Sequence, residues 1–144
     1  MSLINKDQLA HIPLYYLEKT SKNGFVKYVI LEDDKAQEML QDEAKKAEVK
    51  VLNTNWKVLT WKQQNVITKK ATVFTNDGQQ DLDLFEYRDQ RIKTCLHSWD
   101  LTDDRGVPIA ATAENIDQLP SEFVFALINK YDKATSLTEE EQKN

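Results

Sequence analysis

The chain has 144 residues, of which 40% are hydrophobic and 30% charged, and it is long enough for one domain with a hydrophobic core. Its net charge of −5 argues against nucleic acid as the main partner, because phosphate binding requires concentrated lysine and arginine. The single cysteine excludes an intramolecular disulfide, and no apolar run has the length of a signal-peptide core or a membrane span. We therefore expect a protein of the cytoplasm of whichever cell makes it.

The N-terminal residues predict a β-hairpin followed by a helix. Two strand-favouring segments, residues 14–17 and 25–31, are joined through Asn23-Gly24, a pair that tolerates the positive φ angles of a tight turn. Asp33 and Asp34 are expected to cap a helix over residues 35–47. The apolar face of that helix consists mostly of small side chains, so it is expected to pack closely against a sheet.

Three further strands are predicted over residues 49–52, 56–61 and 66–74, the last ending at Asn76-Asp77-Gly78. In the middle strand, Trp56 and Trp61 fall on opposite faces and cannot both enter one core without a bulge. One of the two, with Trp61 as the candidate, is therefore a possible partner contact. A partly exposed tryptophan with only a structural role is the more common alternative.

The same region contains most of the basic side chains: Lys45, Lys46, Lys50, Lys57, Lys62, Lys69 and Lys70. Lysine interleaved with tryptophan is one way to bind single-stranded nucleic acid through stacking and phosphate contacts. The alternative is a solvated face whose lysines protect strand edges from aggregation. We favour the second interpretation, because the whole chain is acidic and this region has no arginine.

A helix is predicted to begin at Asp81 or Asp83 and to continue to residue 99. Asp83 and Glu86 have the spacing of a capping box. The apolar stripe of this helix comprises Leu82, Phe85, Ile92, Leu96 and Trp99. The polar residues Arg88 and Asp89 interrupt the stripe, which indicates either a buried charged pair or curvature of the helix.

The carboxylates around Asp103 and Asp104 first suggest calcium. An EF-hand loop that began at Asp100 would need glycine at the sixth position and glutamate at the twelfth, and the chain has neither there. The segment instead predicts a turn in which Gly106 supplies a positive φ angle. Residues 107–109 are expected to be extended, because Pro108 disfavours helix in the residue before it.

Two helices are predicted near the C-terminus. Thr112 is expected to cap the first, with Ile116 and Leu119 facing inward, and Pro120 to end it. Ser121 is expected to cap the second, whose buried face comprises Val124, Leu127, Ile128 and Tyr131. Phe123 and Phe125 lie outside that face. Such a helix is either central to the core or shared with a partner.

No catalytic constellation is recognisable. Cys95 and His97 are two residues apart on a predicted helix, so they point in different directions and make a poor metal site. The chain contains no phosphate-binding loop, nucleophile elbow or dinucleotide fingerprint. We expect no enzymatic activity, no cofactor and no metal. The predicted fold is α+β, with a β-rich region and one packing helix over residues 1–80 and a helical region over residues 81–144, together one compact unit.

The last third of the chain resembles the tail assembly chaperones of tailed bacteriophages. The motifs that carry the resemblance are Trp-Asp-Leu at residues 99–101, an Asp/Gly turn, Thr-x-Glu-x-Ile-x-x-Leu-Pro at residues 112–120, the apolar helix, and the acidic residues 137–144. Its signature positions are Trp99, Asp103, Asp104, Gly106, Pro108, Thr112, Ile116 and Leu119. The strand-rich first eighty residues have no counterpart in it.

The resemblance implies a non-catalytic protein that binds the tape-measure protein or tail-tube subunits in the host cytoplasm during assembly. The apolar helix surface would make the contact through Phe123, Phe125 and Leu127, with Trp61 as a further candidate and Trp99 holding the helices together. Homo-oligomers are compatible with this function. The alternative is a virion structural component, such as a connector, tail or capsid-associated protein, that joins its neighbours through its sheet. A single-stranded nucleic-acid binder is the third hypothesis.

Overall fold

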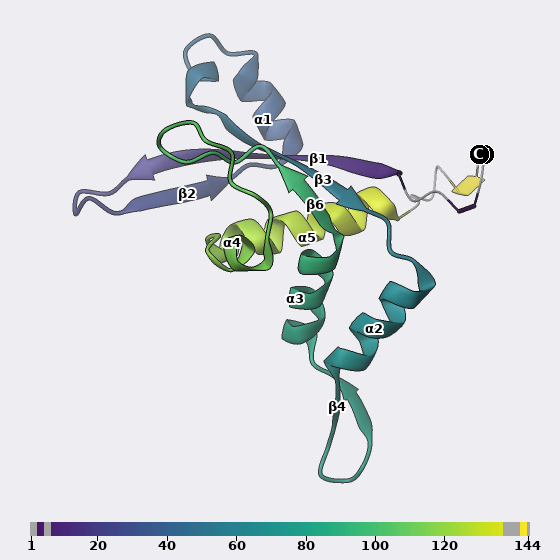
Figure 1. The fold of residues 1–144 in the computed structure, drawn as a ribbon. Helices are drawn as coiled ribbons and strands as arrows, with labels where there is room; N and C mark the ends of the chain where they lie inside the picture. The colour runs from purple at the N-terminus through teal and green to yellow at the C-terminus, as the bar shows by residue number, and fades with distance from the viewer. Residues whose placement is uncertain (1–2, 5–6, 137–141, 144) are drawn as a thin grey trace.

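The sheet of this α+β protein is four-stranded and antiparallel, and it draws strands from both halves of the chain (Figure 1). A computed structural model describes residues 3–4, 7–136 and 142–143. The strand order is β2–β1–β3–β6, and the strands are β1 (Leu9–Thr20), β2 (Val26–Ile30), β3 (Lys50–Lys57) and β6 (Leu96–Trp99). The antiparallel N-terminal part was predicted, whereas the contribution of β6 was not.

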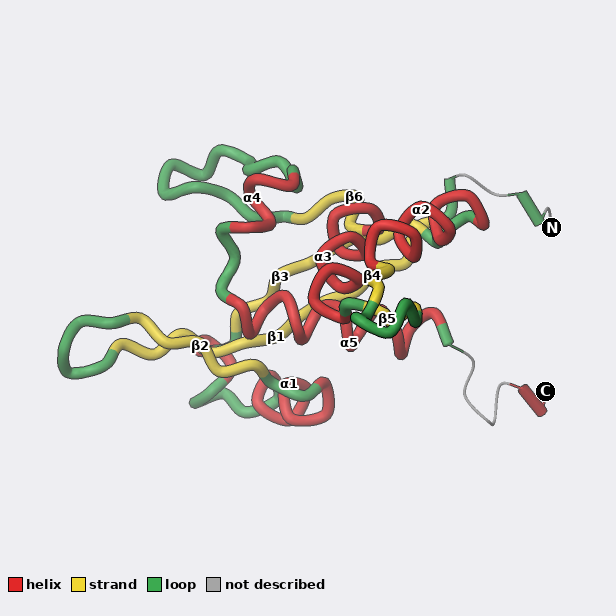
Figure 2. Tube along the Cα trace, turned by 90° about the horizontal axis from the view of Figure 1, so that it is seen from below, coloured by secondary structure: helices red, strands yellow, loops and turns green. Residues whose placement is uncertain are grey.

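The predicted N-terminal hairpin is confirmed. Strands β1 and β2 are antiparallel, with Tyr16 opposite Ile30 and Thr20 opposite Val26. Gly24 has a φ angle of 83°, which L side chains rarely adopt and which this turn requires. The β1–β2 turn projects beyond the rest of the sheet (Figure 2).

Helix α1 (Asp33–Leu40) is shorter than the predicted helix over residues 35–47. Its N-cap is Glu32, which makes no side-chain capping bond, so Asp33 and Asp34 lie in the first turn and do not cap it. The helix ends before the Asp42 carboxylate, which accepts a hydrogen bond from the backbone N–H of Ala44 at 2.9 Å, a local bond that competes with helix. A short 3-10 helix, η1 (Lys46–Glu48), follows.

The prediction of a strand over residues 66–74 is wrong for most of its length. Residues Trp61–Ala71 form helix α2, and only β4 (Thr72–Phe74) is extended, pairing with β5 (Gln80–Leu82) in a separate two-stranded sheet. The two strands predicted over residues 49–52 and 56–61 are one continuous strand, β3, which ends at Lys57.

Helix α3 (Leu84–Cys95) begins where it was predicted, because Asp83 accepts hydrogen bonds from the N–H groups of Phe85 and Glu86 at 3.1 and 3.2 Å. It ends at Cys95 and not at Trp99. The next residues form β6, in which Leu96 is buried and Trp99 lies opposite Thr54 of β3. Pairing with the sheet therefore overrides the helical spacing of the apolar residues.

Helices α4 (Ala113–Asp117) and α5 (Ser121–Thr135) complete the fold. Thr112 caps α4 as predicted, accepting a hydrogen bond from the N–H of Asn115 at 3.2 Å. The prediction that Ser121 caps α5 is wrong. The N-cap is Pro120, which makes no side-chain bond, and Ser121 is the first helical residue.

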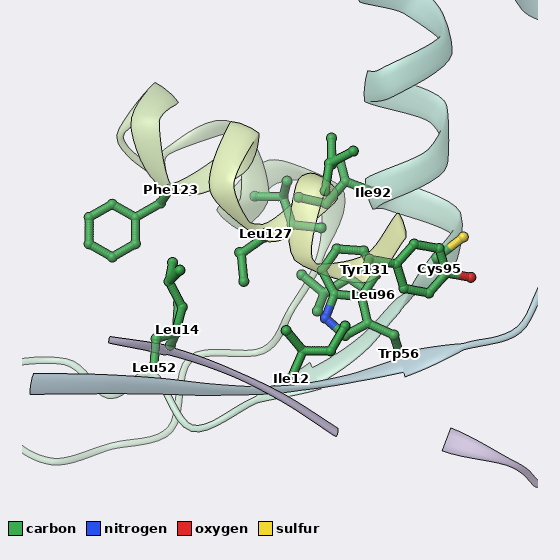
Figure 3. Packing of buried hydrophobic residues seen from close by; sticks show 12 residues of the cluster. Ile12, Leu14, Leu52, Trp56, Ile92, Cys95, Leu96, Phe123, Leu127 and Tyr131 are labelled. Atoms are coloured by element: carbon green, nitrogen blue, oxygen red, sulfur yellow. The ribbon is translucent and has the colours of Figure 1, made fainter. Parts of the chain in front are cut away.

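The main core lies between α5 and one face of the sheet, and the C-terminal end of α3 closes it (Figure 3). The ring of Trp56 stacks on the ring of Tyr131, with 4.8 Å between centroids. Phe123 makes edge contacts with Tyr16 and Tyr28 at 4.9 and 5.1 Å. The buried members of the core come from both sides of residue 80: Ile12, Leu14, Leu52, Trp56, Ile92, Cys95, Leu96, Ile116, Phe123, Leu127, Ile128 and Tyr131.

Candidate functional site

A projection formed by α2, the β4–β5 hairpin and the N-terminal part of α3 extends away from the sheet (Figure 1). We call residues 61–87 of this projection the arm. No residue of the arm belongs to the buried members of the main core. The arm carries many large apolar side chains that are exposed: Trp61, Val66, Val73, Phe74, Leu82, Leu84 and Phe85. Three of them, Trp61, Phe74 and Phe85, are 80%, 68% and 77% exposed.

Local sequence signals determine the shape of the arm. The hydroxyl of Thr60 accepts a hydrogen bond from the N–H of Gln63 at 3.2 Å, and the Gln63 side chain accepts one from the N–H of Thr60 at 3.0 Å. This reciprocal capping box starts α2. At the far end, Gly78 has a φ angle of 78° and turns the hairpin back toward α3.

The arm has a small interior of its own, where α2 packs against α3. Ile67 and Ala71 are buried, although they belong to neither core cluster. Two hydrogen bonds join the helices: the Gln64 amide donates to the Tyr87 hydroxyl at 3.2 Å, and the Asp83 N–H donates to the Ala71 carbonyl at 2.8 Å. The exposed apolar residues therefore lie on an arm that is already packed internally.

The structure separates the four side chains predicted to bind a partner. Phe123 is 5% exposed and Leu127 is fully buried, so both are core residues and the expectation that Phe123 lies outside the buried face is wrong. The predicted core residue Val124 is only half-buried. Phe125 and Trp61 are exposed at 47% and 80%. The candidate contact surface thus narrows to Phe125 and Trp61 and gains the other apolar residues of the arm.

Phe125 borders the base of the arm. The guanidinium of Arg88 lies over its ring, 5.7 Å from the centroid. Asp89 binds Lys93 at 2.9 Å. Arg88 and Asp89 therefore have separate partners, and the Asp89–Lys93 ion pair is only partly buried, so the polar interruption is not a buried charged pair.

A charged and aromatic cluster fixes α3 to α5. The Arg91 guanidinium lies 5.5 Å from the ring centroids of both Tyr87 and Tyr131, and it forms an ion pair with Asp132. Lys93 adds a second link, because it binds Asp117 of α4 at 2.9 Å. The arm is therefore held at its base by several contacts.

Cys95 and His97 do not form a site. Cys95 is buried at the end of α3, whereas His97 is exposed on β6. Burial raises the pKa of the Cys95 thiol, which keeps it protonated and unreactive at neutral pH. Burial also raises the pKa of the neighbouring Tyr131 hydroxyl, which donates a hydrogen bond to the Lys57 carbonyl at 2.8 Å. Cys95 and Tyr131 are therefore both buried residues of the main core.

The signature residues at 99–119 build the loop between β6 and α5. The Trp99 indole N–H donates to the carbonyl of Ile109. The Asp103 carboxylate accepts hydrogen bonds from two backbone N–H groups of the turn at 2.8 and 2.9 Å, and Gly106 has a φ angle of 79°, as predicted. The remaining signature residues take local positions: Asp104 exposed in the turn, Pro108 bridged to Thr102, Ile116 buried and Leu119 packed on the core.

The lysines of the predicted basic sheet are distributed over several elements. Lys50 is paired with Glu18 on the sheet, whereas Lys62, Lys69 and Lys70 lie on α2. Among residues 3–4, 7–136 and 142–143, no group of three or more His, Cys, Asp or Glu side chains is arranged to hold a metal ion. None of the helices described here has the length and apolar character needed to cross a membrane.

Sequence reasoning missed Phe74 and Phe85 because it assigned α2 to a strand and placed Phe85 in a buried stripe. The overlooked signal is Thr60 with Gln63 three residues later, the spacing of a capping box. Comparisons with protein-family models, with curated proteins and with solved structures found no match.

Proposed function

We propose that this chain is a non-catalytic assembly protein that binds a partner protein through the apolar surface of the arm. The observation that carries the proposal is the concentration of seven exposed large apolar residues within positions 61–85. Exposed apolar residues are normally scattered singly, so their concentration on one projection favours an interaction site there. Trp61, Phe74 and Phe85 are the proposed anchors, because aromatic side chains dominate the energetics of interfaces.

The size of the available free energy supports this assignment. An aromatic side chain buries roughly 150–250 Å² when it is fully enclosed. Covering a ring that is about three-quarters exposed therefore removes roughly 150 Å² of apolar surface from water, worth about 4 kcal/mol at about 25 cal/mol per Å². Two or three such rings together contribute about 8–12 kcal/mol, the same order as the loss of translational and rotational freedom on association.

The charge of α2 indicates the kind of surface it meets. The helix has three lysines, Lys62, Lys69 and Lys70, and no acidic residue, although the whole chain has a net charge of −5. A partner that covers Trp61 and Val66 brings its rim close to these lysines. We therefore propose a partner surface that is apolar at its centre and acidic at its rim.

The phage resemblance of residues 99–144 supplies the biological setting of the proposal. In that setting the partner is the tape-measure protein or a tail-tube subunit, and binding takes place in the host cytoplasm during assembly. The chain shields the partner's apolar surface until the tail is built. The exposed edge strand β2, with Val26 and Val29 at 46% and 45% exposure, favours a second candidate, a virion component that joins neighbours through its sheet.

Co-expression with the products of neighbouring genes tests the proposal. Phe85→Asp is expected to weaken capture of the partner about thirtyfold, the effect of losing an interface anchor. Phe25→Asp is the matched control, because Phe25 is 70% exposed near the β1–β2 turn and outside the arm. Equal capture by both variants would contradict the proposal. Purified particles separate the two candidates, since an assembly chaperone is absent from them and a structural component is present in fixed copy number.

A further inference from the structure

The N-terminal half of β1 is an open sheet edge. Strand β1 runs over Leu9–Thr20, but β2 pairs only with its residues 16–20. On the other side, β3 pairs with β1 from Leu9 to Tyr16 without a register shift. In the described part of the chain, residues 9–14 therefore have a strand neighbour on one side only.

The direction of each backbone N–H and C=O group on this edge follows from the position of its residue, odd or even, along the strand. The Tyr15 carbonyl accepts a hydrogen bond from the N–H of Leu31 at 2.9 Å, so the backbone groups of Tyr15 point away from β3. Because backbone direction alternates along a strand, Pro13, His11 and Leu9 point the same way. Pro13 has no N–H, and its carbonyl accepts a bond from Lys130. The outward N–H and C=O groups of His11 and Leu9 have no backbone partner among the described residues.

A groove runs along this edge. It has a volume of about 470 Å³, and its walls are β1, the link between β2 and α1, and the C-terminal half of α5. The apolar part of its lining consists of Ile12, Pro13, Leu14, Ile30, Leu31, Ala126 and Ala134. The space beside Leu9–Pro13 is the position that β2 would fill if it were longer.

The charges of the groove differ between its two ends. Helix α5 runs antiparallel to β1, since Phe123 contacts Tyr16 whereas Tyr131 binds the carbonyl of Lys57, the residue opposite Leu9. Lys133 therefore lies near the open end of the edge. Glu32 and Asp33 lie at the end next to β2, where Lys130 is paired with Asp33. Lys133, by contrast, forms no ion pair in the part of the chain that the structure describes, so the open end alone offers an unpaired positive charge.

We propose that this groove binds an extended acidic segment of a partner protein, which adds as a strand beside Leu9 and His11. Main-chain hydrogen bonds to the two open residues supply the affinity, as in other strand-addition complexes. A carboxylate of the segment lies against Lys133 and fixes the register of the segment relative to β1. This site is separate from the arm, so the protein holds two surfaces, one for an apolar partner face and one for an extended strand.

The test uses two blocked peptides of about eight residues, the length of an ordinary strand, that alternate valine and threonine. One has a glutamate at each end and the other a lysine at each end. The full chain is titrated with each peptide, and amide exchange is followed by NMR. We expect the acidic peptide to slow exchange of the His11 and Leu9 amides at least about tenfold at saturation. The basic peptide is expected to bind more weakly.

Two variants at one position separate strand addition from side-chain binding. His11→Pro removes the outward N–H and leaves the ladder with β3 intact, so it is expected to weaken binding of the acidic peptide at least about tenfold. His11→Ala retains the N–H and is expected to bind within about twofold of the wild type. Lys133→Glu is expected to weaken binding about threefold, as for an exposed ion pair.

Several results would overturn the proposal. Loss of binding in His11→Ala equal to that in His11→Pro would show that the ring, and not the backbone, makes the contact. Exchange changes confined to the arm would place the peptide elsewhere. Protection of the His11 amide before any peptide is added would show that the edge is already covered, by the chain itself or by a second copy. Absence of exchange changes with either peptide would also contradict it.

Discussion

Replacing Phe123 with alanine is expected to destabilise the protein far more than replacing Phe125, two residues later on the same helix. Phe123 is 5% exposed and makes edge contacts with the rings of Tyr16 and Tyr28, so we expect F123A to lower the free energy of unfolding by about 4 kcal/mol. Phe125 is 47% exposed, so it buries only about half as much apolar area as a fully enclosed phenylalanine. F125A is therefore expected to lower the free energy of unfolding by about 1.5 kcal/mol.

Urea unfolding followed by tryptophan fluorescence measures this difference. With a slope of about 2 kcal/mol per molar urea, the midpoint is expected to fall by about 2 M for F123A and by less than about 1 M for F125A. Trp56 is buried against Tyr131 and reports on loss of the core. Equal shifts of the two midpoints, or a larger shift for F125A, would refute the assignment of Phe123 to the core and Phe125 to the surface.

Three further predictions concern local features. Thr60→Ala removes the cap of α2 and is expected to lower the free energy of unfolding by about 1 kcal/mol, with loss of helical circular dichroism in the arm. Because burial raises the pKa of Tyr131 in the folded state above the ordinary value of 10.0, the unfolded chain ionises first, and stability is expected to fall as pH rises above 10.0. Tyr131→Phe should show a smaller fall in alkaline urea titrations. The Cys95 thiol is expected to resist a thiol reagent in the native protein and to react at once in denaturant; rapid native reaction would contradict its burial.

Most features with a local physical cause were predictable from the sequence, although the caps expected at Asp33, Asp34 and Ser121 are not formed. The turn at Gly24, the cap at Asp83, the cap at Thr112 and the turn at Gly106 each depend on residues close in sequence, and the structure confirms all four. In each case a side-chain oxygen or a positive φ angle decides the conformation without help from distant residues.

Features decided by packing were not predictable. Val66, Ile67 and Thr68 favour strands as individual residues, but burial of Ile67 in the interior of the arm favours the helix. The capping box at Thr60, which begins this helix, is a local signal that could have been recognised. Leu96 continues a helical stripe by its spacing, yet it becomes part of a strand because β3 has a free edge there.

The candidate site was predictable only in part. Trp61 was singled out because it fell on the opposite face of a predicted strand from Trp56. In the structure it is exposed because it is the first residue of helix α2 and not part of a strand. Phe123 and Phe125 were equivalent by sequence, because neither belongs to the stripe of Leu127. Only the position of the tyrosines on β1 and β2 makes Phe123 a core residue.

Site-specific photo-cross-linking tests the role of the arm most directly. A photoreactive phenylalanine analogue is placed at position 85, and in a matched variant at position 25, in cells that produce the partner proteins. Both positions hold exposed phenylalanines, at 77% and 70%. We predict a cross-linked complex with a tail component from position 85 and none from position 25. A complex from position 25 alone would contradict the assignment of the arm as the partner-binding surface.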